Sequence, residues 1–481
     1  MPSKARKVLK TLANRASTAR RRAKAAAPSA GPGSVNALQP EHAELLLRVL
    51  EQPTSPFHEQ NVVACVRSFA AERGLNVLQD DAGNLAIDLP AQQASADSKS
   101  AESAKPARLA RSAKPTKPTK PAKSADEASP RVVYLAHMDH PGLWALTPAR
   151  RGVLTARWMG GVPNDRLIGA PVRYYARGEG SEMLSGWPGA GSSFALGGAG
   201  QAGRITKIIR SDARGRAERV RVELADTATR VAAGDLGQFD FGPPRREDGF
   251  IHATAIDNLA SCGVLLCLLD LLHRTGTSTP LRAVFTRAEE GGFFGLCEAA
   301  GARRIHGARP AGSRTAKSSL IGPDDVCIVL EMSKRLAHAA QGNGPIVRVG
   351  DRLAMFAPQV THLLCQSAEQ LQDTRPGFAW QRQLMDGGAC EAAVLCALGL
   401  RVGGVCCPLG NYHNIDEASP GLAQEFIHEH DAARLIDLLA GALPALHDFA
   451  RKPETHRPAW LDRVFEHFDQ VIPCFTDPAA G

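Results

Sequence analysis

The pattern of apolar residues changes twice along this chain of 481 residues, and that change limits the folds that it can adopt. Residues 37–148 and 249–450 alternate short apolar runs with longer amphipathic stretches, which is typical of strands and helices in turn. Between them, residues 149–248 contain short alternating segments separated by glycine-rich turns, as in a small β domain. The sequence therefore predicts one α/β domain that is interrupted by an inserted β domain.

Three further segments lack a pattern that could form a core. Residues 1–36 hold a basic block, with nine Lys/Arg and no acidic residue in the first 35, and end in a Gly/Pro/Ser-rich linker. Residues 91–130 consist mainly of Ala, Lys, Ser and Pro, so they cannot bury enough apolar surface to offset the entropy of ordering. We expect both segments to be disordered, and residues 451–481 to form a C-terminal extension.

The formal charge of +8 is concentrated in two of these segments. Residues 1–35 contribute +9, and residues 96–130, with eight Lys/Arg against four acids, contribute +4, so the rest of the chain nets 8 − 13 = −5. A nucleic-acid-binding core would show the opposite distribution, so we expect no nucleic-acid partner except through the basic tail.

The absence of export and membrane signals favours the cytoplasm. The sequence has no run of about 18 apolar residues that would predict a membrane span, and no apolar signal-peptide core. Its eleven cysteines form no CxxC pair, and several lie in apolar runs, which is typical of reduced buried thiols. Organellar targeting by the Arg-rich N-terminal stretch is the alternative.

Histidine and acidic residues follow two of the predicted core elements. His137 and Asp139 come after the apolar strand 131–136, and a carboxylate two residues from a histidine can accept its second ring N–H. Asp257 opens a strongly apolar helix over 259–273, where a helix N-cap is the alternative role. Taken alone, neither site excludes a structural role.

Three more groups stand at the ends of predicted strands. Glu289 and Glu290 are adjacent after one strand, and a bound cation would offset their repulsion most simply. Glu331 ends another apolar strand, where an unpaired buried carboxylate would be costly. His413 lies in a polar loop after a third strand, where an ordinary surface histidine is the alternative.

Together these side chains make a set of carboxylates and imidazoles without cysteine, which disfavours a structural zinc ribbon. Two divalent metal ions that share one bridging carboxylate would use them all, with zinc as the first choice and cobalt or manganese as alternatives. The predicted ligands are His137, Asp257, Glu290, Glu331 and His413.

The order of these motifs resembles the co-catalytic di-zinc aminopeptidases of the TET-type and glutamyl-aminopeptidase-like group, which are more distantly related to the carboxypeptidase/deacylase metallopeptidases. The resemblance covers residues 37–90 and 131–445. That group has a His-Met-Asp motif, an Asp-Asn motif, a Glu-Glu pair, a strand-end acid and a late His, with a small β domain between the first two. The resemblance implies a three-layer zinc-peptidase (phosphorylase/hydrolase-like) α/β domain with a mixed sheet, interrupted by a β-barrel or PDZ-like domain.

The resemblance also implies a role for each matching residue. His137, Asp257 and Glu331 would hold one metal ion. Asp257, Glu290 and His413 would hold the other, so that Asp257 bridges the two.

Two further carboxylates receive catalytic roles from the same resemblance. Glu289 would be the general base that takes a proton from a metal-activated water and passes it to the leaving amine. Asp139 would orient the first histidine ligand. The implied function is hydrolysis of N-terminal residues of peptides by a homo-oligomer.

Several departures from the family pattern concern the substrate rather than the metals. Glu331 stands where the aminopeptidases usually have Asp, and His140-Pro141 replaces an acidic and an aliphatic residue. The segments 55–59 (Ser-Pro-Phe-His-Glu) and 387–392 (Gly-Gly-Ala-Cys-Glu-Ala) also differ from the usual motifs. In the second of these, Glu391 is a candidate to meet a substrate amine, with ordinary surface exposure as the alternative.

Two other functions remain open from the sequence. A di-metal amidase or deacylase for N-acylated small molecules is favoured by Glu331, because Glu is common at this position in the deacylase and carboxypeptidase branches. A non-catalytic scaffold whose basic tails are the working part would require a degraded metal site.

Overall fold

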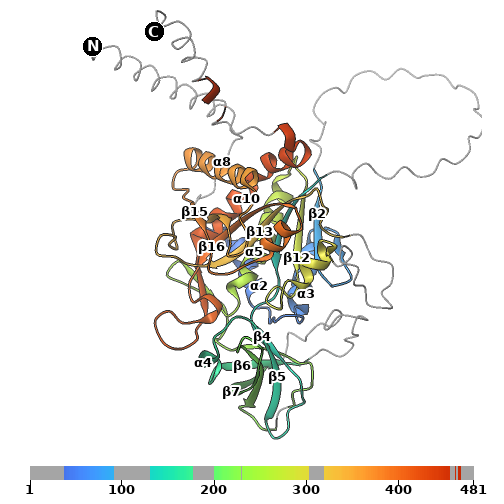
Figure 1. The fold of residues 1–481 in the computed structure, drawn as a ribbon, viewed down its shortest axis with the longest axis vertical. Coiled ribbons are helices and arrows are strands. Elements are labelled where there is room, and N and C mark those ends of the chain that lie inside the picture. The colour runs from blue at the N-terminus through green and yellow to red at the C-terminus, as the bar shows by residue number, and fades with distance from the viewer. Residues whose placement is uncertain are drawn as a thin grey trace, which may run out of the picture.

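The computed structural model describes residues 37–91, 130–176, 200–228, 230–302 and 319–455, together with residue 461 and residues 464–466. The expected basic tail (1–36), nearly all of the expected insertion (91–130) and most of the C-terminal extension (451–481) lie outside the described residues. The described chain forms an α/β body and a separate closed barrel of strands (Figure 1).

A mixed sheet of eight strands forms the centre of the α/β body. In spatial order its strands are β1 (Val77–Gln79), β2 (Leu85–Leu89), β12 (Leu281–Thr286), β3 (Val132–His137), β13 (Val326–Lys334), β16 (Arg401–Leu409), β14 (Ile346–Gly350) and β15 (Gln381–Leu384). The four central strands β12, β3, β13 and β16 run parallel to one another. Their C-terminal ends therefore meet at one edge of the sheet.

Helices cover both faces of this sheet, which is why β3 and β12 are apolar and buried along their whole length. Successive residues of a strand point to opposite faces, so Tyr134 joins one core cluster and Leu135 the other. The first cluster is covered by α2 (Pro40–Leu50), α3 (Gln60–Glu72), α5 (Ile256–Thr275), α8 (Pro358–Thr374) and α10 (Glu429–Arg451). The second is covered by α6 (Phe294–Ala299) and α9 (Glu391–Ala397).

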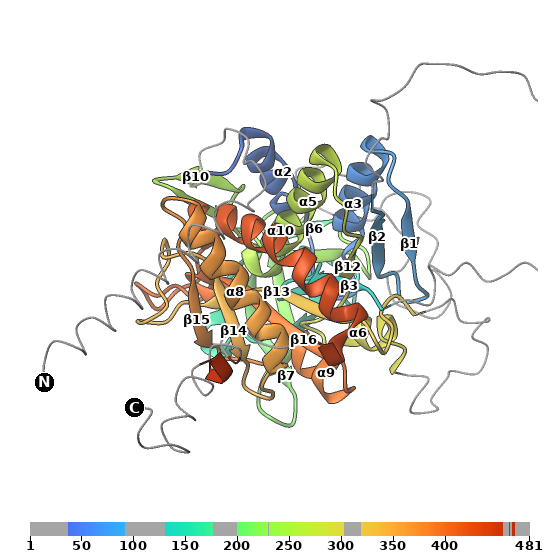
Figure 2. The same ribbon diagram turned by 90° about the horizontal axis from the view of Figure 1, so that it is seen from above.

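The helix α5 is the core helix of the body, and α10 lies between it and α8 (Figure 2). By length and composition alone α5 is apolar enough to cross a membrane, but 89% of its most apolar stretch is buried inside this fold. Its amphipathic pattern is weak because it contacts the sheet on one side and α2 and α10 on others.

Replacing Leu265 in α5 with Ala is expected to lower the free energy of unfolding by about 2–5 kcal/mol, because a fully buried Leu leaves a cavity that the sheet cannot close. Urea denaturation followed by circular dichroism at one protein concentration measures it. Leu353→Ala, at a side chain 72% exposed, is the matched control and should change stability by less than about 0.5 kcal/mol. Equal effects of the two changes would contradict this packing.

The inserted β segment is a closed barrel of six strands with a core of its own. In the order around the barrel the strands are β4 (Gly142–Ala145), β5 (Val153–Met159), β8 (Ala217–Leu224), β7 (Gln201–Ser211), β6 (Pro171–Tyr175) and β9 (Leu236–Phe239). Alternate residues such as Val220 and Val222 point inward, as the alternating sequence pattern predicts. The first barrel strand begins at Gly142, only five residues after the end of β3.

A small three-stranded sheet joins two distant parts of the chain near the start of α5. It contains β10 (Arg245–Glu247), β11 (Phe250–Ala253) and β17 (Glu425–His428). The register pairs Ala253 with Glu425, which brings the beginning of β17 beside the residues that lead into α5.

Candidate metal centre

The parallel register of the central strands gathers the predicted residues at one edge of the sheet. His137 is the last residue of β3, and it pairs with Thr286, the last residue of β12. The loop that follows Thr286 carries Glu289 and Glu290 three and four residues later. Glu331 lies in the neighbouring strand β13.

Three carboxylates surround the imidazole of His137, which is almost fully buried. Its Nε2 atom lies 3.7 Å from Oδ1 of Asp257, 3.7 Å from Oε2 of Glu331 and 3.9 Å from Oε2 of Glu289. An imidazole nitrogen and carboxylate oxygens at this spacing are a group that could hold a metal ion.

A second cluster forms around His413, whose Nε2 atom lies 3.0 Å from Oε1 of Glu290 and 3.7 Å from Oδ2 of Asp257. The two carboxylate oxygens of Asp257 therefore face two different histidines, Oδ1 toward His137 and Oδ2 toward His413. That is the geometry that a carboxylate bridging two metal ions requires.

Two further observations support the binding of metal ions by these residues. The possible ligand atoms of His137, Glu289 and Glu331 lie within 4.8 Å of one another. So do those of Asp257, Glu290 and His413, and Asp257 also lies close to His137 of the first group. Oδ1 of Asp257 and Oε1 of Glu331 are buried and have no hydrogen-bond partner among the described residues. Buried carboxylate oxygens without partners are costly, and a bound cation removes that cost.

The pKa shifts of the clustered carboxyl groups also favour a nearby positive charge. Burial, and next the charge of Glu331, raises the pKa of Asp257 to about 8. Burial also raises the pKa of Glu289 well above its usual value. Burial alone would raise the pKa of Glu290 too, but the neighbouring His413 lowers it to about 2. The raised pKa values of Asp257 and Glu289 are what burial of several carboxylates without a cation produces, and a bound cation would favour their charged forms.

Asp257 does not serve as a helix cap. The helix α5 is kinked at Asp257 and Asn258, and Oδ1 of Asp257 has no hydrogen-bond partner among the described residues, so it caps no N–H group. The backbone of Asp257 is not helical (φ −83°, ψ 103°), which turns its carboxylate toward the histidines. The capping alternative from the sequence is therefore wrong for this residue.

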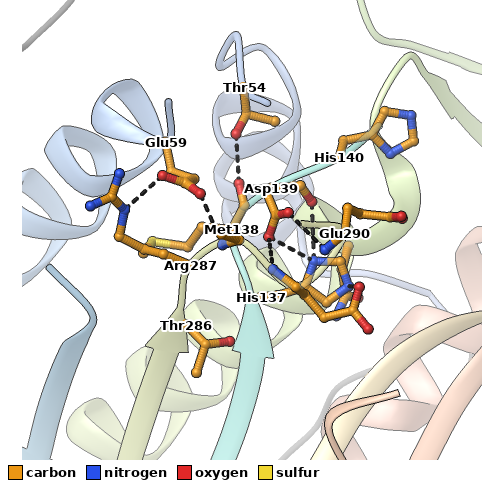
Figure 3. A network of polar contacts seen from close by, with 12 residues as sticks. Thr54, Glu59, His137, Met138, Asp139, His140, Thr286, Arg287 and Glu290 are labelled. Atoms are coloured by element: carbon orange, nitrogen blue, oxygen red, sulfur yellow. Dashed lines mark hydrogen bonds and ion pairs between the residues drawn. The ribbon is translucent and has the colours of Figure 1, made fainter. Parts of the chain in front are cut away.

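Asp139 supports both the first histidine and the loop after β12 (Figure 3). Its Oδ1 accepts a hydrogen bond from the backbone N–H of Glu289 (2.9 Å) and its Oδ2 from that of Glu290 (3.0 Å). Oδ1 also lies 3.4 Å from Nδ1 of His137. A carboxylate in this place can fix the tautomer of a histidine ligand and hold the loop at the same time.

Replacing Asp139 with Asn is expected to lower zinc affinity by about 10–100-fold, because one amide oxygen cannot accept from two loop N–H groups and the imidazole together. Competition with a chromogenic zinc chelator measures the affinity. Asp165→Asn, at a side chain 79% exposed, is the control. An Asp139→Asn protein that binds zinc like the original would contradict this role.

Sequence reasoning missed Glu425, which ties the two ligand loops together. Its Oε2 accepts from the backbone N–H of Asp257 and its Oε1 from that of His413, both at 2.8 Å, and the side chain is fully buried. No sequence signal marks it, because its partners are backbone amides and one of them lies 168 residues away.

His140, where the sequence departs from the family pattern, belongs to the support of the site. It is buried and does not line the cavity. Its Nδ1 is hydrogen-bonded to the carbonyl oxygen of Asp257, and its Nε2 lies 2.8 Å from Oδ1 of Asn414. The departure at His140 therefore lies behind the cavity, against the backbone of Asp257.

A cavity of about 710 Å³ opens over the predicted ligands and over Glu289. The barrel contributes one wall through the β7–β8 hairpin, and residues 387–390 contribute another. Glu391 is not part of the lining and is 0% exposed. The expectation that Glu391 meets a substrate amine, and its surface alternative, are both wrong.

Two clusters of buried ligands at the carboxyl edge of a mixed sheet, facing a cavity, define a metal-dependent hydrolase of the α/β class. The sequence model of the M42 glutamyl aminopeptidase family matches residues 121–420, which is more than half of the chain, and the chain belongs to this family. It is therefore a metal-dependent aminopeptidase. No curated protein matches the sequence.

Solved structures with a similar fold include three archaeal peptidases. A TET aminopeptidase from a marine sediment archaeon of the Thaumarchaeota is 17% identical, with a TM-score of 0.59, covering 86% of this chain and 100% of that one. An aminopeptidase from Desulfurococcus kamchatkensis is 16% identical, with a TM-score of 0.57, covering 85% and 95%. The TET1 peptidase of Pyrococcus horikoshii is 15% identical, with a TM-score of 0.55, covering 84% and 99%. At these identities the structures support the fold.

Proposed function

We propose that this protein removes N-terminal residues from peptides with two zinc ions bound at the edge of the sheet. The observation that carries the proposal is the placement of Asp257, whose two oxygens face two separate imidazole–carboxylate clusters. The proposed ligands of the first ion are His137, Asp257 and Glu331, and those of the second are Asp257, Glu290 and His413.

Distances alone do not separate the general base from the ligands, since Glu289 is nearly as close to His137 as Asp257 and Glu331 are. The buried oxygens that lack a hydrogen-bond partner do distinguish the general base from the ligands. One oxygen of Asp257 and one of Glu331 are buried and have no hydrogen-bond partner in the described part of the chain, as expected of atoms that bind a cation. Neither carboxylate oxygen of Glu289 is such a buried atom without a partner, and Glu289 borders the cavity together with the proposed ligands, so we assign it the proton transfers.

When bound, the metal ions would polarise the substrate carbonyl and bring the pKa of a water molecule toward about 7. The chain itself supplies the proton path. Glu289 would accept a proton from the attacking water and pass it to the leaving amine. In the metal-free site, burial raises the pKa of the Glu289 carboxyl, which is the direction that suits a general base at neutral pH. Asp139 keeps the loop in place during both transfers by holding the backbone N–H of Glu289.

The test compares short peptides with a free N-terminus against the same peptides after N-acetylation, with zinc- or cobalt-loaded protein. Release of the first residue from free peptides, and none from acetylated ones, is expected. No turnover across a broad panel of free peptides would contradict the proposal.

A second candidate function is the hydrolysis of N-acylated amino acids, and the observation that favours it is the glutamate at position 331. The same experiment decides between the two. Activity on acyl-amino acids without activity on free peptides would select the amidase or deacylase.

We also propose that the chain forms a homo-oligomer in the cytoplasm. The structurally similar TET1 peptidase of Pyrococcus horikoshii can assemble into a tetrahedron or a large octahedral shell. The ten cysteines among the described residues are all free, which agrees with a reducing compartment. Light scattering coupled to size-exclusion chromatography measures the subunit number, and a monomer at micromolar concentration would contradict assembly.

A further inference from the structure

Four successive backbone N–H groups in the loop after β12 each donate to a buried side-chain oxygen. The N–H of Arg287 donates to Asn84 (2.9 Å) and that of Ala288 donates to Glu59 (3.0 Å). The next two, at 289 and 290, donate to Asp139. The three acceptors come from three different parts of the chain, so the loop is held from several sides.

Glu59 is the acceptor with the most unusual surroundings, because it is a fully buried carboxylate. Its Oε2 accepts a hydrogen bond of 2.6 Å from Nε of Arg287, and its Oε1 accepts from the backbone N–H of Phe57 as well as that of Ala288. Arg287 is equally satisfied, since its other nitrogens donate to the carbonyl oxygens of Ala82 and Phe57. Figure 3 shows this pair beside Asp139.

This ion pair requires an explanation other than stability, because a buried ion pair often stabilises a fold no better than apolar side chains of the same size. The backbone conformation of the loop provides that explanation. Ala288 has a φ of +52°, in the left-handed region that a residue with a Cβ atom rarely adopts. The hydrogen bond from its N–H to Glu59 holds the loop in that conformation, directly before the residue that we propose as the general base.

The two glutamates of the loop depend on this support to different degrees. The carboxylate of Glu290 is itself fixed by His413 at 3.0 Å. Among the described residues, the carboxylate of Glu289 has only a longer ion-pair contact, 3.9 Å to His137. Its position is therefore set mainly by the backbone that carries it.

We propose that Glu59, neutralised by Arg287, is a positioning residue for Glu289. It fixes the loop so that the base meets the substrate in a productive geometry, while the metal ligands are held by other contacts. The inference rests on the proposed function of Glu289. Glu59 belongs to the segment Ser-Pro-Phe-His-Glu at 55–59, which departs from the family pattern. Its ion pair with Arg287 is the contact that fixes the loop.

Glu59→Gln keeps the size of the side chain but removes its charge and turns one acceptor into a donor facing Arg287. We expect kcat on aminoacyl p-nitroanilides to fall by about 10–100-fold, since small displacements of a catalytic group have effects of this size. KM and the zinc content per chain should stay within about twofold of the original, because the ligand clusters are not touched. This separation of kcat from KM and metal content is what a merely structural role would not produce.

Asp270→Asn is the matched control. Asp270 is also a buried carboxylate paired with arginines, to Arg73 at 2.8 Å and to Arg274 at 2.8 Å. It lies thirteen residues beyond Asp257 on α5, about 20 Å away at 1.5 Å per residue. Its kcat should equal that of the original protein, even though its stability falls.

The outcomes distinguish this inference from the proposed function. An unmodified protein without activity on any substrate overturns the proposed function. An active original with an unchanged kcat in zinc-loaded Glu59→Gln overturns the positioning role, and so does a loss of kcat that is matched by an equal loss of zinc. If Glu59→Gln does not fold, Arg287→Lys replaces it, because the lysine keeps the charge but cannot reach all three acceptors. A kcat lowered at full zinc content then supports the inference, and an unchanged kcat overturns it.

Discussion

Replacement of Glu289 by Gln should lower kcat by about 10²–10⁴-fold, while both metal ions stay bound. The amide has the size of the carboxylate, but it cannot accept a proton from the attacking water. The loop should keep its conformation, because the backbone N–H of residue 289 still donates to Asp139. Steady-state kinetics on the best peptide substrate, with metal analysis of the same sample, measures both quantities.

The control for this change is Glu72→Gln, at a side chain 45% exposed and far from the predicted ligands in the fold. It should have the kcat of the original protein. If Glu289→Gln kept full activity, another group would be the base. If it lost a metal ion, Glu289 would be a ligand, as its distance of 3.9 Å from His137 would also allow.

Replacement of Asp257 by Asn should remove both metal ions and abolish activity. The residue faces both clusters, and an amide offers one neutral oxygen where the site needs two charged ones. Glu331→Gln is the matched comparison, because Glu331 faces only His137 and its loss should empty one site. The expected zinc content is therefore close to none per chain in the first variant and close to one in the second.

Metal analysis after gel filtration measures the two contents. Equal contents in Asp257→Asn and Glu331→Gln would contradict a bridging role for Asp257. Circular dichroism confirms that each variant is folded, since both side chains are buried and their neighbours must be accommodated.

The gathering of these residues at one site could be predicted because each proposed ligand interrupts an apolar pattern at or near the end of a core element. His137 ends the apolar strand β3, and Glu331 follows the apolar run 326–330 inside β13, so the sequence marks both as polar groups where burial is expected. Parallel strands bring such ends together, which is why residues almost 280 positions apart could be assigned to one site. The order of the strands was not predictable, because it depends on pairings between distant segments. The closed barrel was expected only from the resemblance, and the PDZ-like alternative is not confirmed.

The supporting residues were hidden for a different physical reason. Glu425 and Glu59 act through backbone amides, and any residue can supply a backbone amide, so the partner leaves no trace in the sequence. The sequence shows only that position 140 is a histidine, so its departure from the family pattern was interpreted as affecting the substrate. Its contacts in the structure are with the carbonyl oxygen of Asp257 and with Asn414. Glu391 was misplaced because α9 begins there and turns its side chain inward.

The most direct test of the two-metal account is an anomalous-scattering map at the zinc edge, from crystals of the zinc-loaded protein. The account predicts two peaks, one on each side of Asp257, each about 2.0–2.2 Å from carboxylate oxygen or imidazole nitrogen. His137 should ligate one ion and His413 the other. A single peak, or two peaks without Asp257 between them, would contradict it.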